Sequence, residues 1–192
     1  MPPKQKFNKE VVLETAFQLV REQGVENLNA RSLAKMLHSS VQPVFSYYDN
    51  MTDLKTDLLA MVNEYHSRYF DKVIADENLF TNVGLAYISF AIEEPNLFKL
   101  LFMTNGFDGK HLSQFVSGNC NEHITSAIPD VLDRSISESN SIFTDMWLYA
   151  HGIASMIVTN QLSFERSEIE SMLKNMFSLL TSKQTGENNE IV

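Results

Sequence analysis

The stretch that decides the fold of this chain is NARSLAKMLHSSVQPVFSYY, which runs from Asn29 to Tyr48. It predicts two short helices separated by a tight polar turn. Three apolar residues of the first helix recur at helical spacing and face the same way, namely Leu33, Ala34 and Leu37. The turn ends at Ser40, whose hydroxyl can accept a hydrogen bond from a free backbone amide of the second helix.

The second helix of this stretch begins close to Pro43. In the first turn of a helix, the missing N–H of a proline removes no intrahelical hydrogen bond, and its fixed φ suits the helix. After the proline, we expect Val44 and Phe45 to pack inward. The side chains left for a partner are then Val41, Gln42, Ser46 and Tyr47.

Two helices in this arrangement are the layout of a DNA-binding helix-turn-helix, whose second helix enters the major groove while the first crosses the backbone. Taken alone, twenty residues of this kind also fit an ordinary all-α protein. The flanking sequence favours the helix-turn-helix, because a helical stripe ends before it at Gln23 and Gly24 and residues 48–54 open a long helix after it.

The whole arrangement resembles the tetracycline-repressor (TetR) family of bacterial transcriptional regulators. Four blocks carry the resemblance at the family's spacing, namely residues 16–24 (AFQLVREQG), Leu33 with Ala34, residues 44–48 (VFSYY), and Leu54 with Leu58 and Leu59. Three positions depart from the family pattern. His38 replaces a turn glycine, Gln42 replaces a glycine of the recognition helix, and Met51 replaces a lysine that commonly approaches phosphate. The first departure requires an uncommon positive φ at a non-glycine residue.

The resemblance implies an all-α fold with an N-terminal three-helix helix-turn-helix head and a C-terminal antiparallel helical bundle as its body. We place the head at residues 1–54, the body at 55–183 and a frayed tail at 184–192. The serines and asparagines around Pro129 predict a loop region at 128–141. The spacing of apolar residues predicts helices after the stretch at 50–75, 79–92, 95–103, 110–127, 140–161 and 165–182.

Charge is distributed unevenly along the chain. Residues 1–48 carry six Lys and Arg against four Glu, a balance of +2, whereas residues 49–192 carry nine against twenty, a balance of −11. Because only the face near phosphate needs to be positive, a modestly basic head on an acidic body agrees with DNA binding. The same balance also fits an N-terminal tail with a few solvated lysines.

We therefore expect the head to bind double-stranded DNA at a palindromic operator. Phosphate contacts are expected from Asn29, Arg31 and Tyr47, and base contacts from Val41, Gln42 and Ser46. Lys35 and Ser40 complete the predicted DNA-binding set.

A palindromic operator requires a two-fold homodimer, because one helix-turn-helix contacts too few bases for useful specificity. We expect the interface to involve residues 143–161 and 165–182. Small residues at Ala150, Gly152 and Ala154 would let two helices approach closely. The alternative is that the last helix only covers its own body.

The body is rich in aromatic residues, and its 79–92 helix is apolar on every side. The segment from Trp147 to Gly152 also resembles the Trp-x-x-x-His-Gly signature of one group of TetR-family bodies. We expect a pocket for a small hydrophobic effector, lined by some of Tyr65, Tyr69, Tyr87, Phe90, Phe102, Trp147 and His151. The alternative is that these side chains are plain core.

The resulting expectation is a repressor that leaves its operator when a hydrophobic ligand binds the body, since the 50–75 helix would join the body to the head. The alternative is a TetR-like DNA-binding protein without a small-molecule ligand, controlled by a protein partner.

Sequence motifs for catalysis or metal binding are missing. There is no Gly-x-Ser-x-Gly, no His-Glu-x-x-His and no Cys-x-x-Cys, and the five histidines share no metal-ligand spacing. We expect no enzyme, no catalytic residue, no metal and no cofactor. The single cysteine, Cys120, and the lack of an apolar run long enough to span a bilayer predict a cytoplasmic protein without membrane contact.

Overall fold

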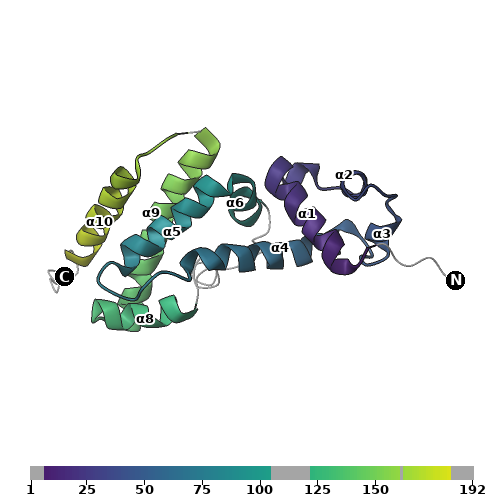
Figure 1. Cartoon of the computed structure of the whole chain (residues 1–192). Coiled ribbons are helices and arrows are strands. Elements are labelled where there is room, and N and C mark those ends of the chain that lie inside the picture. Colours follow the sequence, from purple (N-terminus) through teal and green to yellow (C-terminus); the bar gives the residue numbers. More distant parts are fainter. Residues whose placement is uncertain (1–6, 105–121, 161, 183–192) are drawn as a thin grey trace, which may run out of the picture. The chain divides into compact units, whose positions relative to one another are not determined.

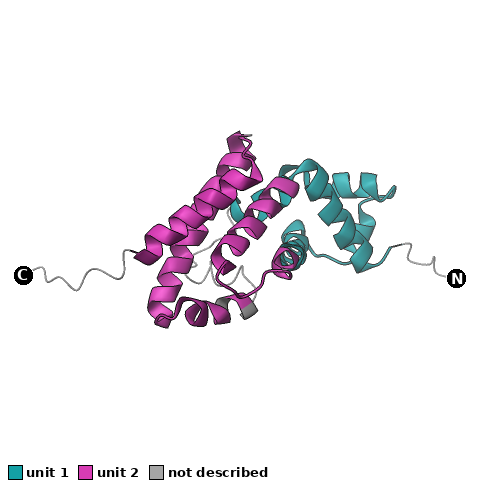
Figure 2. Cartoon of the chain, turned by 60° about the vertical axis from the view of Figure 1, so that its left-hand side comes forward, with its two compact units in different colours: residues 1–66, 94–108 teal, residues 67–93, 109–192 magenta. Residues whose placement is uncertain are grey.

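The computed structural model describes residues 7–104, 122–160 and 162–182, and every regular element in these ranges is a helix (Figure 1). This confirms the expected all-α fold class. The chain divides into two compact units, coloured separately in Figure 2: unit 1 is residues 1–66 with 94–108, and unit 2 is residues 67–93 with 109–192. No helix in the described ranges is long and apolar enough to cross a membrane.

Unit 1 begins with a helix whose two ends are both capped. It contains α1 (Lys9–Gln23), the 3-10 turn η1 (Val25–Asn27), α2 (Ala30–Met36), α3 (Gln42–Phe45), α4 (Met51–Ser67) and α6 (Pro95–Phe102). The Asn8 side chain accepts a hydrogen bond from the Val11 amide at 2.9 Å and starts α1. Gly24 ends α1 with a φ of 85°, a conformation that residues with a Cβ rarely adopt.

The core of unit 1 is formed by the apolar stripes that the sequence predicts. Each fully buried Val, Leu or Phe side chain in these stripes stabilises the fold by about 1.5–3 kcal/mol relative to leaving it exposed. The buried members are Val12, Ala16, Phe17 and Val20 of α1, Leu33 and Ala34 of α2, Val44 of α3, and Leu54, Leu58 and Val62 of α4.

The prediction of one unbroken helix over residues 50–75 is wrong. The helix α4 ends at Ser67, and the chain continues as the 3-10 turn η2 (Arg68–Phe70). Phe70 is fully buried, but none of the next eight residues is, so a longer helix would have no apolar face to bury.

Unit 2 contains η2, α5 (Leu79–Glu93), α8 (Glu122–Leu132), α9 (Ile136–Asn160) and α10 (Arg166–Ser182). As expected, α5 is buried on nearly all sides, and it packs against α9 and α10. At Gly84, an added Cβ would lie only 2.8 Å from Cδ2 of Leu173 in α10. A glycine at this position therefore lets the two helices approach closely.

The predicted loop at 128–141 is also wrong, since only residues 133–135 separate α8 from α9. Ile124 and Ile128 lie four residues apart and are buried, which outweighs the hydrogen bond lost at Pro129 inside α8. The start of α9 is a capping box: Ser135 Oγ accepts from the Glu138 amide at 3.3 Å, and the Ser135 amide donates to Glu138 Oε2 at 3.2 Å. Most of the expected 110–127 helix and the expected tail at 184–192 lie outside the described residues.

Candidate nucleic-acid interface and cavity

The turn between α2 and α3 is built around His38. Its φ is 48°, so the histidine adopts the left-handed conformation that the missing turn glycine would otherwise take. The turn is closed by a hydrogen bond from the Ser39 amide to the Ala34 carbonyl at 2.9 Å. The departure from the family pattern at this position is therefore accommodated without loss of the turn.

The helix α2 presents two cations. Arg31 and Lys35 are four residues apart and exposed, so both lie on one outer face of the helix. Asn29, expected at phosphate, is the N-cap: its Oδ1 accepts from the amides of Arg31 at 3.1 Å and Ser32 at 3.0 Å. The position of Asn29 thus has a structural role that fixes where α2 begins.

The helix α3 differs from the prediction at one position. Val44 is buried, but Phe45, expected to pack inward, is 49% exposed. The next inward position on the helix is taken by Tyr48, four residues after Val44, so Phe45 is turned outward by about one hundred degrees. Phe45 joins the three side chains that the sequence correctly leaves outside, and together they form what we call the α3 face, namely Val41, Gln42, Phe45 and Ser46.

The remaining predicted DNA contacts are hydroxyl groups with partners inside the protein. Tyr47 donates its hydroxyl proton to the Phe7 carbonyl at 2.7 Å. Ser46 donates to the Gln42 carbonyl at 2.9 Å, and Ser40 Oγ accepts a long hydrogen bond of 3.4 Å from the Gln42 amide. As arranged here, Tyr47 has no proton left to donate to a phosphate, and Ser46 has none left to donate to a base.

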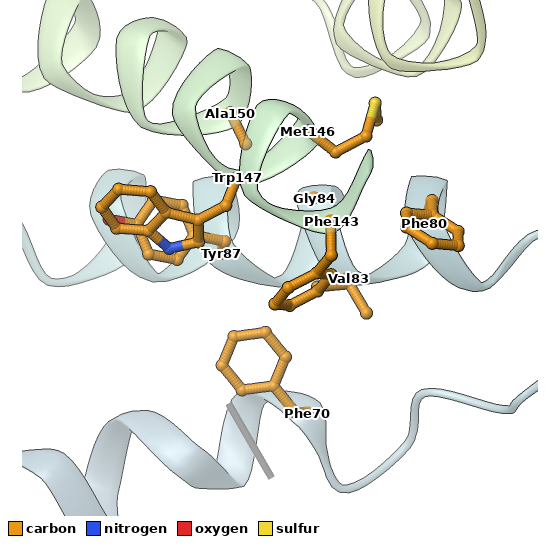
Figure 3. Close-up of a pocket in the computed structure, with 9 residues that line it drawn as sticks. All are labelled: Phe70, Phe80, Val83, Gly84, Tyr87, Phe143, Met146, Trp147 and Ala150. Carbon is orange, nitrogen blue, oxygen red and sulfur yellow. The ribbon is translucent and has the colours of Figure 1, made fainter. Parts of the chain in front are cut away.

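A cavity lies inside unit 2, between η2, α5 and α9 (Figure 3). Its volume is about 10 Å³, room for about one water molecule. Figure 3 shows the Phe70 ring pointing from η2 toward the ring of Phe143. The lining is almost wholly apolar and consists of Phe70, Phe80, Val83, Gly84, Tyr87, Phe143, Met146, Trp147 and Ala150.

Two polar groups beside this cavity, those of Tyr87 and His151, are paired with each other. The Tyr87 hydroxyl and His151 Nδ1 share a hydrogen bond of 2.8 Å, and the His151 ring stacks on Trp147 at 4.9 Å between centroids. Burial lowers the pKa of His151 below its usual value, because desolvation disfavours the charged form of the ring. The cavity is therefore suited to uncharged apolar groups. Within the described ranges, no cluster of three or more His, Cys, Asp or Glu is placed to hold a metal ion.

Comparison with known proteins yields matches among solved structures. A member of the TetR family from Streptomyces coelicolor A3 has a TM-score of 0.62 at 12% identity, over 91% of this chain and 98% of its own. A TetR transcriptional regulator from Rhodococcus sp. RHA1 has a TM-score of 0.53 at 14% identity, and the match covers 90% of this chain and 95% of the regulator. The chain has the TetR-family fold. A Rhodococcus sp. RHA1 protein of unknown function has a TM-score of 0.64 at 16% identity, and the match covers 95% of this chain and 98% of that protein. No family model and no curated protein matches the sequence.

In this TetR-like chain, the seven residues predicted for the ligand pocket fall into separate groups. Tyr87 and Trp147 line the cavity, and His151 is bonded to Tyr87. Tyr69 and Phe90 belong to unit 2 but form their own edge-to-face pair at 5.2 Å outside the lining. The other two belong to unit 1, namely Tyr65 and Phe102.

Sequence reasoning missed several lining residues, Phe70, Phe80, Phe143 and Met146 among them. All four occupy ordinary apolar positions of helices or helical turns, so their spacing is the same for core and for cavity. Phe70 differs from the other three because it lies after the end of α4 and is still fully buried. Its burial depends on the fold and could not be predicted from the local sequence.

Sequence reasoning also missed an ion pair that joins three helices of unit 1. Arg21 of α1 donates two hydrogen bonds to Glu94, from Nε at 2.8 Å and from Nη2 at 2.5 Å. Glu94, the N-cap of α6, is only 5% exposed and also accepts from the Tyr65 hydroxyl of α4 at 2.9 Å. Asn96 adds a hydrogen bond to the Arg21 carbonyl at 3.0 Å. We call this group the Arg21–Glu94 clasp.

Proposed function

We propose that this protein is a transcriptional regulator that binds a palindromic DNA operator as a homodimer. The observation that carries the proposal is the α3 face, exposed beside the two cations of α2 in a chain with the TetR-family fold. Arg31 and Lys35 supply charge for the phosphates, and the α3 face supplies an amide and apolar groups for base edges. The net charge of +2 on residues 1–48, against −11 on residues 49–192, is consistent with this proposal.

Dimerisation is supported by an unfilled apolar face on α9. Leu148 and Met156 are exposed, and Gly152 between them has no atom within 4 Å of where its Cβ would stand. These three positions are four residues apart and lie on one side of the helix. A second copy packed there would bury this face and double the DNA-reading surface.

The proposed regulation is release of the operator by a small hydrophobic ligand in unit 2. Pockets for drug-sized ligands measure about 300–1,000 Å³, so the small cavity must enlarge by movement of side chains. Among the lining side chains, Phe70 is the one whose movement would most directly affect α4, because it lies only three positions after the last residue of that helix. A ligand that displaces Phe70 would alter the end of α4, and differential binding to two conformations would change operator affinity.

The small volume of the cavity also favours the second candidate, a DNA-binding regulator that lacks a small-molecule ligand and is controlled by a protein partner. A thermal-shift screen of hydrophobic compounds discriminates between the two candidates. A ligand that binds only the folded state raises the melting temperature, by an amount that grows with its concentration.

The DNA-binding function is tested by selecting duplexes from a random pool at low salt. The wild-type protein is expected to retain a palindromic sequence, and the Arg31→Ala/Lys35→Ala variant is expected to bind every duplex more weakly. A Lys72→Ala/Lys99→Ala variant loses the same charge at exposed sites outside α2 and α3 and serves as the control. If the wild-type protein retains no duplex, the proposed function is wrong.

A further inference from the structure

The α3 face carries two large apolar side chains in an otherwise polar surrounding. Val41 is 38% exposed and Phe45 is 49% exposed. The Phe45 amide donates to the Val41 carbonyl at 3.4 Å, so the two residues are one helical turn apart and lie on the same side of α3. Single exposed apolar residues are ordinary on protein surfaces, but two on one face of so short a helix mark a contact surface.

The polar groups around this pair leave few ways to contact a base. Gln42 is exposed and offers one amide, while the Ser46 hydroxyl proton is already donated to the Gln42 carbonyl. The helix itself carries no charged residue. Apolar contact is therefore the main means by which α3 can distinguish one base from another.

In the major groove, thymine alone presents an apolar group, its C5 methyl. We propose that Val41 and Phe45 select thymines in each operator half-site by packing against these methyl groups. The inference rests on the proposed DNA-binding function and assigns Phe45 a role in specificity. With Gln42 beside them and able to pair with adenine, the two side chains favour a half-site centre rich in A·T pairs.

A protein partner fits this surface less well. A stable protein interface buries about 800 Å² and 20–30 residues on each side, whereas the apolar pair is two side chains on a four-residue helix. The adjacent cations of α2 also match a phosphate backbone.

The test uses the operator recovered by selection and replaces its thymines one at a time with deoxyuridine, which lacks only the C5 methyl. Wild-type affinity is expected to fall about fourfold at one or two positions of each half-site. This corresponds to about 0.8 kcal/mol, the value of one buried methylene-sized group, at 1.4 kcal/mol per tenfold. Deoxyuridine at other positions should have no effect.

The variant Phe45→Ala should bind the thymine operator more weakly and lose the deoxyuridine penalty at one position. Gln42→Ala should keep that penalty in full, and so should Val11→Ala, which removes an apolar side chain of similar exposure from α1. If Phe45→Ala binds too weakly to measure, Phe45→Leu must show a reduced penalty at the same position.

Two results overturn the inference while leaving DNA binding intact. One is a wild-type protein that binds its operator equally well with deoxyuridine at every thymine. The other is a Phe45 variant that retains the whole penalty at every position. If the wild-type protein retains no duplex in the selection, the proposed function itself has failed, which is a different outcome.

Discussion

At the scale of single residues, the helix-turn-helix separates two kinds of DNA contact. Arg31 is exposed on α2 and carries a charge, so Arg31→Ala should weaken binding to all sequences and reduce the salt dependence by about one phosphate contact. Gln42 offers a side-chain amide, so Gln42→Ala should cost about 1–3 kcal/mol at one base position only. Titrations of both variants against the operator and its single-base variants measure the difference. A uniform loss for Gln42→Ala would contradict the assignment.

His38 adopts a backbone conformation that is unfavourable for a residue with a side chain. A residue with a Cβ at a φ of 48° is destabilised by about 1–2 kcal/mol, whereas glycine adopts this conformation freely. Relief of this strain should stabilise the variant His38→Gly, but glycine loses more backbone entropy on folding, which offsets part of the gain. We therefore expect His38→Gly to raise the free energy of unfolding by about 1 kcal/mol. Urea denaturation measures this change. His38→Ala keeps the strain and should show no gain; a gain in both variants would point to an unfavourable contact of the imidazole instead.

At the scale of elements, the Arg21–Glu94 clasp fixes α1, α4 and α6 to one another in unit 1. Removing one partner of a buried ion pair costs about 3–5 kcal/mol, but Arg21 is 42% exposed and solvent reduces this cost. We expect Arg21→Met to lower the free energy of unfolding by about 2 kcal/mol. The double variant Arg21→Met/Glu94→Leu should recover part of the loss, because it leaves no buried charge.

The exposed pair Lys174–Glu170, at 2.6 Å on α10, provides the matched control for the clasp. Lys174→Met should change stability by less than about 0.5 kcal/mol, as is usual for an exposed pair within one helix. Chemical denaturation measures the free energy of unfolding of each variant and shows whether the clasp stabilises the protein more than the exposed pair does. If Arg21→Met costs no more than Lys174→Met, the clasp is not a stabilising contact.

At the scale of the whole molecule, the first question is assembly. Gly152→Glu places a charge in the apolar face of α9 where the single chain has open space, so the fold should remain while the dimer is lost. Ser137→Glu adds the same charge at the exposed first turn of α9 and should leave the dimer intact. Light scattering at micromolar concentration measures both variants. A monomeric wild-type protein would rule out the proposed interface.

The second whole-molecule question is whether the cavity transmits a signal. Trp147→Ala should abolish the response of operator binding to a ligand found by thermal shift, while operator binding without ligand is kept. Because truncation of a buried Trp costs about 3–5 kcal/mol, Trp147→Phe is the milder companion and should weaken the response. Equal losses of folding and DNA binding in both variants would identify Trp147 as ordinary core.

Much of the fold could be predicted from the sequence because the decisive patterns are local. Apolar residues at helical spacing require a buried stripe, and this requirement placed α1, α2, α5, α9 and α10 close to where they lie. The polar turn before Pro43 located the helix-turn-helix, since caps and a first-turn proline act within a few residues. Exposure of Val41 and Gln42 followed from the same periodicity.

What only the tertiary structure decided depends on segments that are distant in sequence. Val44 and Tyr48 are buried and Phe45 is exposed, although apolar spacing alone fits either aromatic residue on the inward side, so packing against the other helices of unit 1 decided between them. The clasp joins Arg21 to Glu94, which lie 73 positions apart in the sequence, so no local sequence pattern could predict it. Phe70 lines the cavity and its neighbour Tyr69 does not. Which of the two side chains is enclosed depends on the helices that pack around them. Periodicity says that a side chain faces inward, but close packing determines which neighbours it meets there and whether any space is left between them.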